Sequence, residues 1–161
     1  MCFELLLNFD YEDTAQIKGI LENAYIVGIG STLKGDDGAG PYIVNQFIER
    51  GFTNFLDAGV ALENHIFKII EKPYKNVILI DAVDMSQDPG SISLLDVDTL
   101  AGGGISTHTM SLKMAGELLS EGGKRLHLIG VQPLNMSLGN GLSSVVKATA
   151  DKLISFWLSA F

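Results

Sequence analysis

The sequence lacks several features that would place it in a large class of proteins. It contains one cysteine, Cys2, which excludes an internal disulfide and any zinc or iron–sulfur site built only from cysteines of one chain. Acidic residues outnumber basic ones by 19 to 11, and the net charge is −8. We therefore expect no nucleic-acid partner, because binding to a phosphate backbone depends on concentrated positive charge.

Long apolar runs are also missing. No segment approaches the roughly 20 apolar residues that a transmembrane helix needs. The run Leu5–Leu7 follows Glu4 and has no basic residues before it, which is unlike a secretory signal. We expect a cytoplasmic protein that does not insert into membranes.

What remains is the composition of a folded domain. The chain has 161 residues, of which 47% are hydrophobic, and this is enough to build the core of one domain. Its 18 glycines gather in clusters, which points to loops with special backbone angles. We interpret residues 1–23 as an N-terminal extension of unknown role and residues 24–161 as a single α/β domain.

From residue 24 onward, short apolar runs alternate with segments of helical periodicity. Strands are expected at 24–29, 54–57, 77–80, 91–95 and 126–131. Helices are expected from residue 41 and over 62–71, 111–119 and 143–158. This alternation is typical of βαβ units. It predicts a three-layer helix–sheet–helix sandwich with a mostly parallel, twisted sheet.

Acidic residues follow the predicted strands, and one histidine precedes a predicted helix. In this architecture the chemistry gathers at the carboxyl edge of the sheet. The candidates for this edge are Asp36, Asp37, Asp57, Asp81, Asp84 and His108. Carboxylate oxygen and imidazole nitrogen together suit a divalent transition metal, and three protein ligands would leave one position for water or substrate.

Most of these residues also have a simple structural interpretation as helix caps, turn residues or loop carboxylates bonded to the backbone. That interpretation applies to Asp36, Asp37, Asp57, Asp84 and His108. It is harder to apply to Asp81, because this residue follows four buried aliphatic residues and a carboxylate there needs a partner or a role. Glu63 is either a residue that supports a ligand or a solvated residue at a helix start.

Other chemistries receive less support. Gly28-x-Gly30 is next followed by Gly35, so the dinucleotide-binding spacing G-x-G-x-x-G is not met. The Gly-x-Ser-x-Gly turn of serine hydrolases does not occur. An aspartic-protease dyad formed by Asp37 and Asp81 is a further alternative, and it requires the two carboxyl groups to lie within hydrogen-bond distance.

Taken together, the motifs resemble the hydrogenase maturation endopeptidases, and most closely the branch that serves formate-hydrogenlyase-type enzymes. The resemblance spans about residues 24–155, with the motifs in family order. The matching stretches are Gly28-Ile29-Gly30 leading to Asp36-Asp37-Gly38, Asp57-Ala58-Gly59, Asp81-Ala82-Val83-Asp84, Ser106-Thr107-His108 and Gly130-Val131-Gln132-Pro133. One departure is Ser31, where many relatives have asparagine.

The resemblance implies a specific activity. Family members remove a short C-terminal extension from the large-subunit precursor of a nickel–iron hydrogenase after nickel has been inserted. They bind a metal through residues that correspond here to Asp37, Asp81 and His108. In this chain Asp57 and Asp84 would then orient the ligands or accept protons, and Glu63 is a further candidate for a supporting residue. Nickel would arrive with the substrate, and zinc or cadmium could take its place. The ligands would serve recognition of the metal, catalysis, or both.

Two other functions fit the same residues. One is a nickel-sensing maturation chaperone that binds the precursor without cutting it. The other is a small-molecule metallohydrolase on the same fold.

Overall fold

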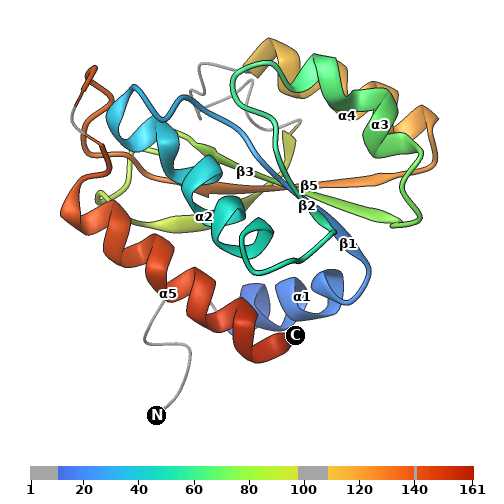
Figure 1. The fold of residues 1–161 in the computed structure, drawn as a ribbon, viewed down its shortest axis with the longest axis horizontal. Helices are drawn as coiled ribbons and strands as arrows, with labels where there is room; N and C mark the ends of the chain where they lie inside the picture. The colour runs from blue at the N-terminus through green and yellow to red at the C-terminus, as the bar shows by residue number, and fades with distance from the viewer. Residues whose placement is uncertain (1–10, 98–108, 140) are drawn as a thin grey trace.

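The core of the protein is a five-stranded sheet with helices on both faces (Figure 1). It is seen in a computed structural model that describes residues 11–97, 109–139 and 141–161. The strand order is β2-β1-β3-β5-β4, and only β4 is antiparallel to its neighbour. The strands are β1 (Ala24–Gly28), β2 (Phe55–Asp57), β3 (Asn76–Ala82), β4 (Ile92–Leu95) and β5 (Arg125–Val131).

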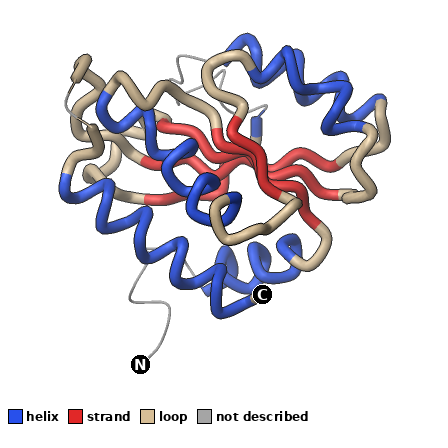
Figure 2. Tube along the Cα trace, viewed as in Figure 1, coloured by secondary structure: helices blue, strands red, loops and turns tan. Residues whose placement is uncertain are grey.

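The helices form the two outer layers. They are α1 (Tyr11–Leu21), α2 (Ala39–Ile48), α3 (Ile66–Ile70), α4 (Thr109–Glu121) and α5 (Ser144–Ala160), with the 3-10 turns η2 (Gly35–Gly38) and η3 (Leu62–His65). Helices α1, α2 and α5 cover one face of the sheet, and α3 and α4 cover the other (Figures 1 and 2). The predicted three-layer sandwich with a mostly parallel sheet is therefore confirmed.

The central strand β3 explains why the fold has two cores. Its side chains alternate between the faces, so Ile78 and Ile80 pack with α2 and α5 while Val77 and Leu79 pack with α3 and α4. All four are buried. A strand covered on both faces is expected to be apolar without interruption, and this is the pattern that marked residues 77–80 in the sequence.

The buried side chains of the helices also lie on the face that packs against the sheet. In α5 the buried residues Val146, Ala150, Leu153 and Trp157 are three or four positions apart, which places them on one side of the helix. Helix α1 contributes Ile17 to the core beneath α2 and α5. Part of the predicted N-terminal extension thus packs against the domain, and a boundary at residue 23 stays a prediction.

Two segments differ from the expected elements. The helix predicted over 62–71 is divided into η3 and α3, with Glu63, Asn64 and His65 in the first part; asparagine and histidine are weak helix formers. The stretch Gly35–Gly38, which precedes the helix expected from residue 41, forms the 3-10 turn η2. This turn leads directly into α2 and carries two of the candidate acids, Asp36 and Asp37.

The order of the strands creates a switch point beside β1. The chain moves from β1 to β2 on one side, and then crosses back to place β3 on the other side. Connections that diverge in this way leave a crevice outside the carboxyl ends of the two strands. Helix α2 starts close to this crevice, because a Cβ on Gly40 would lie only 2.4 Å from the carbonyl oxygen of Ile80.

His127 on β5 gives the fold a dependence on pH. Its Nε2 lies 3.1 Å from Oδ1 of Asn76, and partial burial, helped by the charge of Arg125, lowers the pKa of this imidazole from its usual 6.5. Below pH 6.5 the unfolded chain therefore binds more protons at this residue than the folded chain does, so the free energy of unfolding is expected to fall.

Urea unfolding between pH 8 and pH 5.5 tests this expectation. The midpoint of wild type should decrease with falling pH more steeply than that of His127→Gln, whose amide can still contact Asn76. Equal slopes for the two proteins would show that His127 does not contribute.

Candidate active site

Asp81 is a charged residue that directly follows the four buried aliphatic residues of β3. It lies near the carboxyl end of β3, opposite Gly130 of β5, and it is 0% exposed. Because side chains alternate along a strand, Asp81 is on the same face as Val77 and Leu79, which α3 and α4 cover. A carboxylate buried this completely in the middle of a sheet is unusual without a function or a partner.

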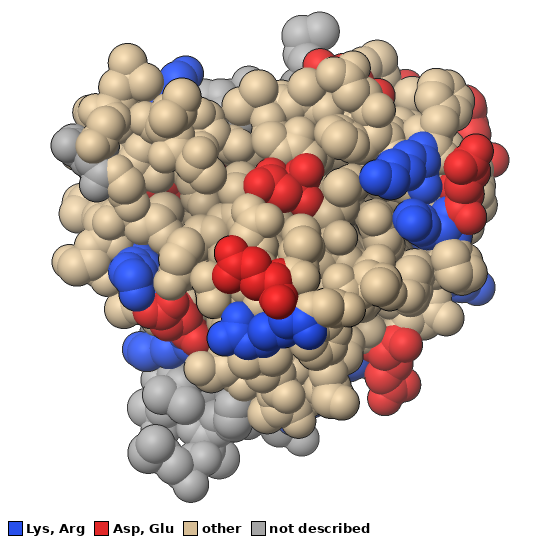
Figure 3. Space-filling view, in the orientation of Figure 1, with Lys and Arg blue, Asp and Glu red and all other residues tan. Residues whose placement is uncertain are grey.

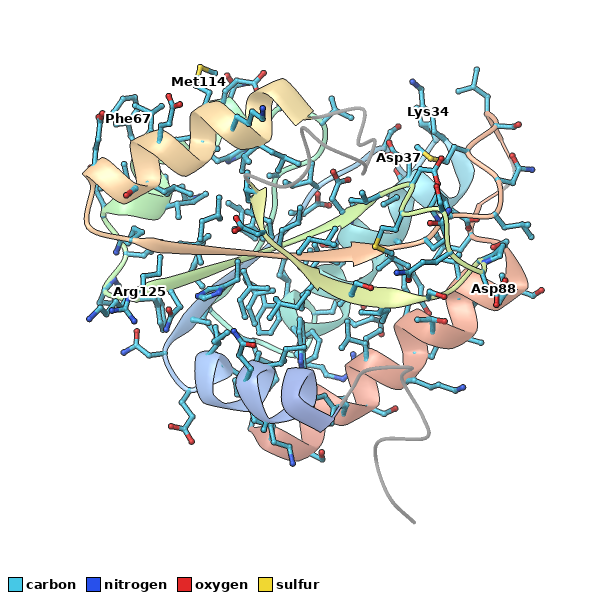
Figure 4. All side chains as sticks on the ribbon, turned by 180° about the vertical axis from the view of Figure 1, so that it is seen from behind. Lys34, Asp37, Phe67, Asp88, Met114 and Arg125 are labelled. Carbon is cyan, nitrogen blue, oxygen red and sulfur yellow. The ribbon has the colours of Figure 1, made fainter. Side chains whose placement is uncertain are left out.

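Asp37 is brought to the same edge from a different part of the chain. It lies on η2, which follows β1 and contacts β3, and it is 2% exposed. The backbone N–H of Ser31 donates a 2.8 Å hydrogen bond to its Oδ2. Since that contact uses the backbone of Ser31, it does not depend on the side chain at this position. Figure 4 shows Asp37 at the end of the molecule opposite Arg125.

Asp36, next to Asp37, has a different role. Its carboxylate accepts hydrogen bonds from the backbone N–H groups of Leu134 (2.8 Å), Asn135 (2.9 Å) and Ser143 (2.7 Å) and from the Ser143 hydroxyl (2.9 Å). It is completely buried. Asp36 therefore ties η2 to the loop between β5 and α5. Neither acid caps a helix, because η2 and α2 begin without a side-chain cap.

Gly30 allows the loop after β1 to close over Asp37. Its φ is +134°, and a Cβ at this position would lie 1.8 Å from the backbone oxygen of Asp37. Its own N–H donates to the carbonyl of Gly59 at 2.9 Å. The position thus needs a glycine both for its backbone angles and for space.

A Gly30→Ala variant is expected to lose about 2–4 kcal/mol of unfolding free energy, because the loop must move away from η2 or adopt strained angles. Gly51→Ala is a matched control, since it also has a positive φ but has open space around its Cα. Denaturant unfolding of both variants should show the larger loss for Gly30. Similar losses would mean that backbone strain alone, and not the contact with Asp37, sets the cost.

Asp57 and Asp84 are each held by one nearby backbone N–H group and one side-chain amide. The Asn45 side-chain amide donates to Oδ2 of Asp57 at 2.8 Å, and the N–H of Gly59 donates to its Oδ1 at 2.9 Å. Asp84 is exposed and accepts from the N–H of Ser86 at 3.0 Å. This bond and one from the side chain of Gln132 keep the pKa of Asp84 below its usual value, which makes it a weak proton acceptor.

The two candidates that remain are Glu63 and His108. Glu63 is exposed on η3. His108 lies outside the described residues. Among the residues that the structure does describe, no three histidine, cysteine or acidic side chains are placed to hold a metal ion together. The ligand set Asp37, Asp81 and His108 therefore stays a prediction.

The structural role of Gln132 was not predicted from the sequence. Its Oε1 accepts from the N–H of Met85 at 2.6 Å, and its Nε2 donates to Asp84 at 3.2 Å. It is 7% exposed and fixes the loop after β3 to the end of β5. Its place in the Gly130–Pro133 motif was visible in the sequence, but its partners lie more than 40 positions away.

A cavity of about 330 Å³ lies beside η2 and the first turns of α2. Its lining includes Thr32, Tyr42, Asn45 and Leu142. Tyr42 is fixed by a 2.7 Å hydrogen bond from its hydroxyl to Asp151, and Asn45 is the residue that donates to Asp57. The surface next to the buried acids is thus hollowed and partly polar.

The charged side chains do not form one extended patch on the face seen in Figure 3. Acidic and basic residues occur there in small separate groups with wide uncharged areas between them. None of the helices in the described part of the chain is long and apolar enough to cross a membrane.

The protein has the fold of known endopeptidases. The hydrogenase maturating endopeptidase HybD from Escherichia coli superimposes with a TM-score of 0.70 at 25% identity, over 86% of this chain and 91% of that one. The crystal structure of the [NiFe] hydrogenase maturation protease HycI from Thermococcus kodakarensis gives a TM-score of 0.75 at 22% identity, over 90% and 97%. At that identity the second similarity shows the fold alone.

The sequence comparisons identify the family. A family model described as hydrogenase maturation protease matches residues 42–160. The chain is 33% identical over 108 residues to the hydrogenase 3 maturation protease of Escherichia coli K12, covering 65% of this chain and 69% of the relative. The chain belongs to the hydrogenase maturation proteases and is an endopeptidase.

Proposed function

We propose that this endopeptidase removes a short C-terminal extension from the nickel-loaded large-subunit precursor of a nickel–iron hydrogenase. The observation that carries the proposal is the burial of two carboxylates, Asp37 and Asp81, at the switch point of a chain from this family. A structural relative at 25% identity, HybD from Thermococcus kodakarensis, is named as a [NiFe] hydrogenase maturation protease. The assignment to the formate-hydrogenlyase-type branch rests on the sequence motifs quoted above. On this proposal the reaction takes place in the cytoplasm.

The predicted ligands suit a divalent metal. Asp37 and Asp81 provide carboxylate oxygens, and His108 immediately precedes α4, whose buried side covers the face on which Asp81 lies. Carboxylate oxygen together with imidazole nitrogen is a donor set that nickel and zinc accept. When bound, such a metal would polarise the carbonyl of the scissile bond or lower the pKa of a water molecule.

The chain's own residues have distinct tasks in this proposal. The carboxylates of Asp37 and Asp81 hold the metal carried by the substrate or accept a proton from the attacking water. Because both are buried, their interaction with an incoming charge is screened less than it would be in water. Asp57 and Asp84 orient the loops around them through the contacts described above. In the aspartic alternative, the two acids share the proton transfers and the metal serves only for recognition.

A processing assay tests the proposal directly. Precursor with and without nickel is incubated with the protein, and its mass is measured. Loss of a C-terminal peptide only from the nickel-loaded precursor is the expected result. Nickel-dependent complex formation without any mass loss would instead support a non-cleaving chaperone. Hydrolysis of small esters or amides without action on the precursor would support a small-molecule hydrolase.

The same assay tests the ligand assignment. Asp37→Ala and His108→Ala should both abolish cleavage, whereas Glu71→Gln, an exposed position at the end of α3, should not. Cleavage at the wild-type rate by both alanine variants would show that these residues are not the ligands.

A further inference from the structure

Three exposed leucines lie on the two loops next to Asp37. Leu33 is 71% exposed, Leu134 is 60% exposed and Leu138 is 73% exposed. Leu33 belongs to the loop between β1 and η2, and the other two belong to the loop between β5 and α5. Exposed apolar groups that gather in one place mark a surface that another molecule covers.

The two loops are fastened to each other, so the leucines are held in one arrangement. The N–H of Gly139 donates to the carbonyl of Leu33 at 3.0 Å, and the N–H of Asp36 donates to the carbonyl of Asn135 at 2.8 Å. The buried carboxylate of Asp36 holds the N–H of Leu134. A surface fixed in this way loses little conformational entropy when a partner binds.

The charge of this region differs from that of the whole protein. Within residues 31–38, 133–139 and 141–143 the charged residues are Lys34, Asp36 and Asp37, and the two acids are buried. Lys34 therefore supplies the exposed charge of these loops, in a chain with a net charge of −8. Figure 4 shows Lys34 pointing away from the body of the protein at the same end as Asp37.

We infer that Leu33, Leu134, Leu138 and Lys34 form the docking surface for the protein substrate. The partner that fits is a segment of the precursor with aliphatic or aromatic side chains over the three leucines and an acidic side chain facing Lys34. Docking there places the adjoining chain of the precursor beside Asp37. The inference rests on the proposed function, because it takes the precursor as the partner.

The first test separates binding of the precursor from its cleavage. The triple variant Leu33→Ser/Leu134→Ser/Leu138→Ser is compared with wild type on the nickel-loaded precursor. We expect KM to rise by at least about tenfold, since buried apolar anchors dominate such interfaces, while kcat changes little. Lys34→Glu should raise KM more at low salt than at high salt.

The matched control carries serine at two exposed apolar residues far from this surface. Phe67 is 73% exposed and Met114 is 48% exposed. Figure 4 shows Phe67 at the opposite end from Asp37 and Lys34, with Met114 in the same half of the molecule as Phe67. Phe67→Ser/Met114→Ser should keep the wild-type KM. Thermal unfolding of both variants checks their folds, and single leucine variants replace the triple variant if it has lost stability.

The second test measures binding, with the leucines intact or replaced in the same Asp37→Asn background, in which cleavage is slow and any loss of a metal contact is common to both proteins. Biolayer interferometry with immobilised precursor should show at least about tenfold weaker binding when the leucines are replaced. If wild type cleaves but the leucine variant has an unchanged KM and affinity, the docking surface is wrong and the proposed function stands. If no cleavage occurs but the leucine variant loses binding, the docking surface stands and the endopeptidase reaction is wrong. No binding to the wild-type chain overturns both.

Discussion

Replacement of Asp37 by asparagine is expected to slow processing of the hydrogenase precursor by about 10³-fold, the size of effect seen when a group that transfers a proton in the reaction is removed. The fold should remain intact. The asparagine oxygen can still accept the hydrogen bond from the backbone N–H of Ser31, which is 2.8 Å from the carboxylate in the wild type. What the variant loses is the negative charge, and with it the capacity to hold a metal or to accept a proton.

This prediction is checked by single-turnover cleavage of the nickel-loaded precursor, followed by mass spectrometry, together with urea unfolding of the variant. Asp81→Asn should behave in the same way, because Asp81 is equally buried at the neighbouring strand. Glu71→Gln controls for the loss of one negative charge from the protein. A variant at position 37 that cleaves within a few-fold of wild type would remove this residue from the mechanism.

Replacement of the adjacent Asp36 by alanine is expected to lower the free energy of unfolding by about 3–5 kcal/mol, because it leaves several buried donors without their charged acceptor. Those donors are the backbone N–H groups of Leu134, Asn135 and Ser143 and the hydroxyl of Ser143. For a chain of this size, the change corresponds to a fall in Tm of about 6–20 °C.

Calorimetry and urea unfolding measure this loss. Asp88→Ala is the control, since Asp88 is exposed and a surface substitution of this kind changes stability by less than about 0.5 kcal/mol. A loss for Asp36→Ala as small as that of the control would mean that solvent replaces the missing carboxylate. The two loops would then be held together by other contacts.

These two predictions assign opposite roles to consecutive aspartates. Both are buried on the same short turn, yet Asp36 bonds to residues about 100 positions away, while Asp37 contacts Ser31 six positions before it. The dipeptide in the sequence does not distinguish them. The difference arises from the direction in which each side chain leaves a 3-10 turn, and from the loop that happens to pack on one side of it.

Much of the fold could be predicted from local patterns. The uninterrupted apolar stretch of β3 and the three- and four-residue spacing in α5 depend only on which faces are buried, and both were recognised. The division of residues 62–71 into η3 and α3 was not, because weak helix formers within an apolar pattern leave the boundary to the packing around it. Helix α1 was given no role, although Ile17 and Leu21 are buried against the same core as α5.

The candidate site was predictable only in part. The rule that parallel strands present their carboxyl ends at one edge predicted that Asp37 and Asp81 lie at the same edge of the sheet. In the structure both are buried, Asp81 near the end of β3 and Asp37 on the turn η2, which follows β1 and contacts β3. Gln132 and Asn45 could not be found in this way, because amides have no preferred position in the pattern and act through distant partners. His108 lies outside the described residues, so its part in the site stays a prediction.

By itself, the sequence determined the layered α/β architecture, the family and the group of acids that belong at one end of the sheet. These properties follow from hydrophobic periodicity and from motifs that are local in the chain. Only the tertiary structure decided which aspartate supports the loops, which is buried at the switch point, and where the exposed leucines gather. These outcomes depend on the packing of segments that lie far apart in the chain, and no local pattern encodes a contact of that kind.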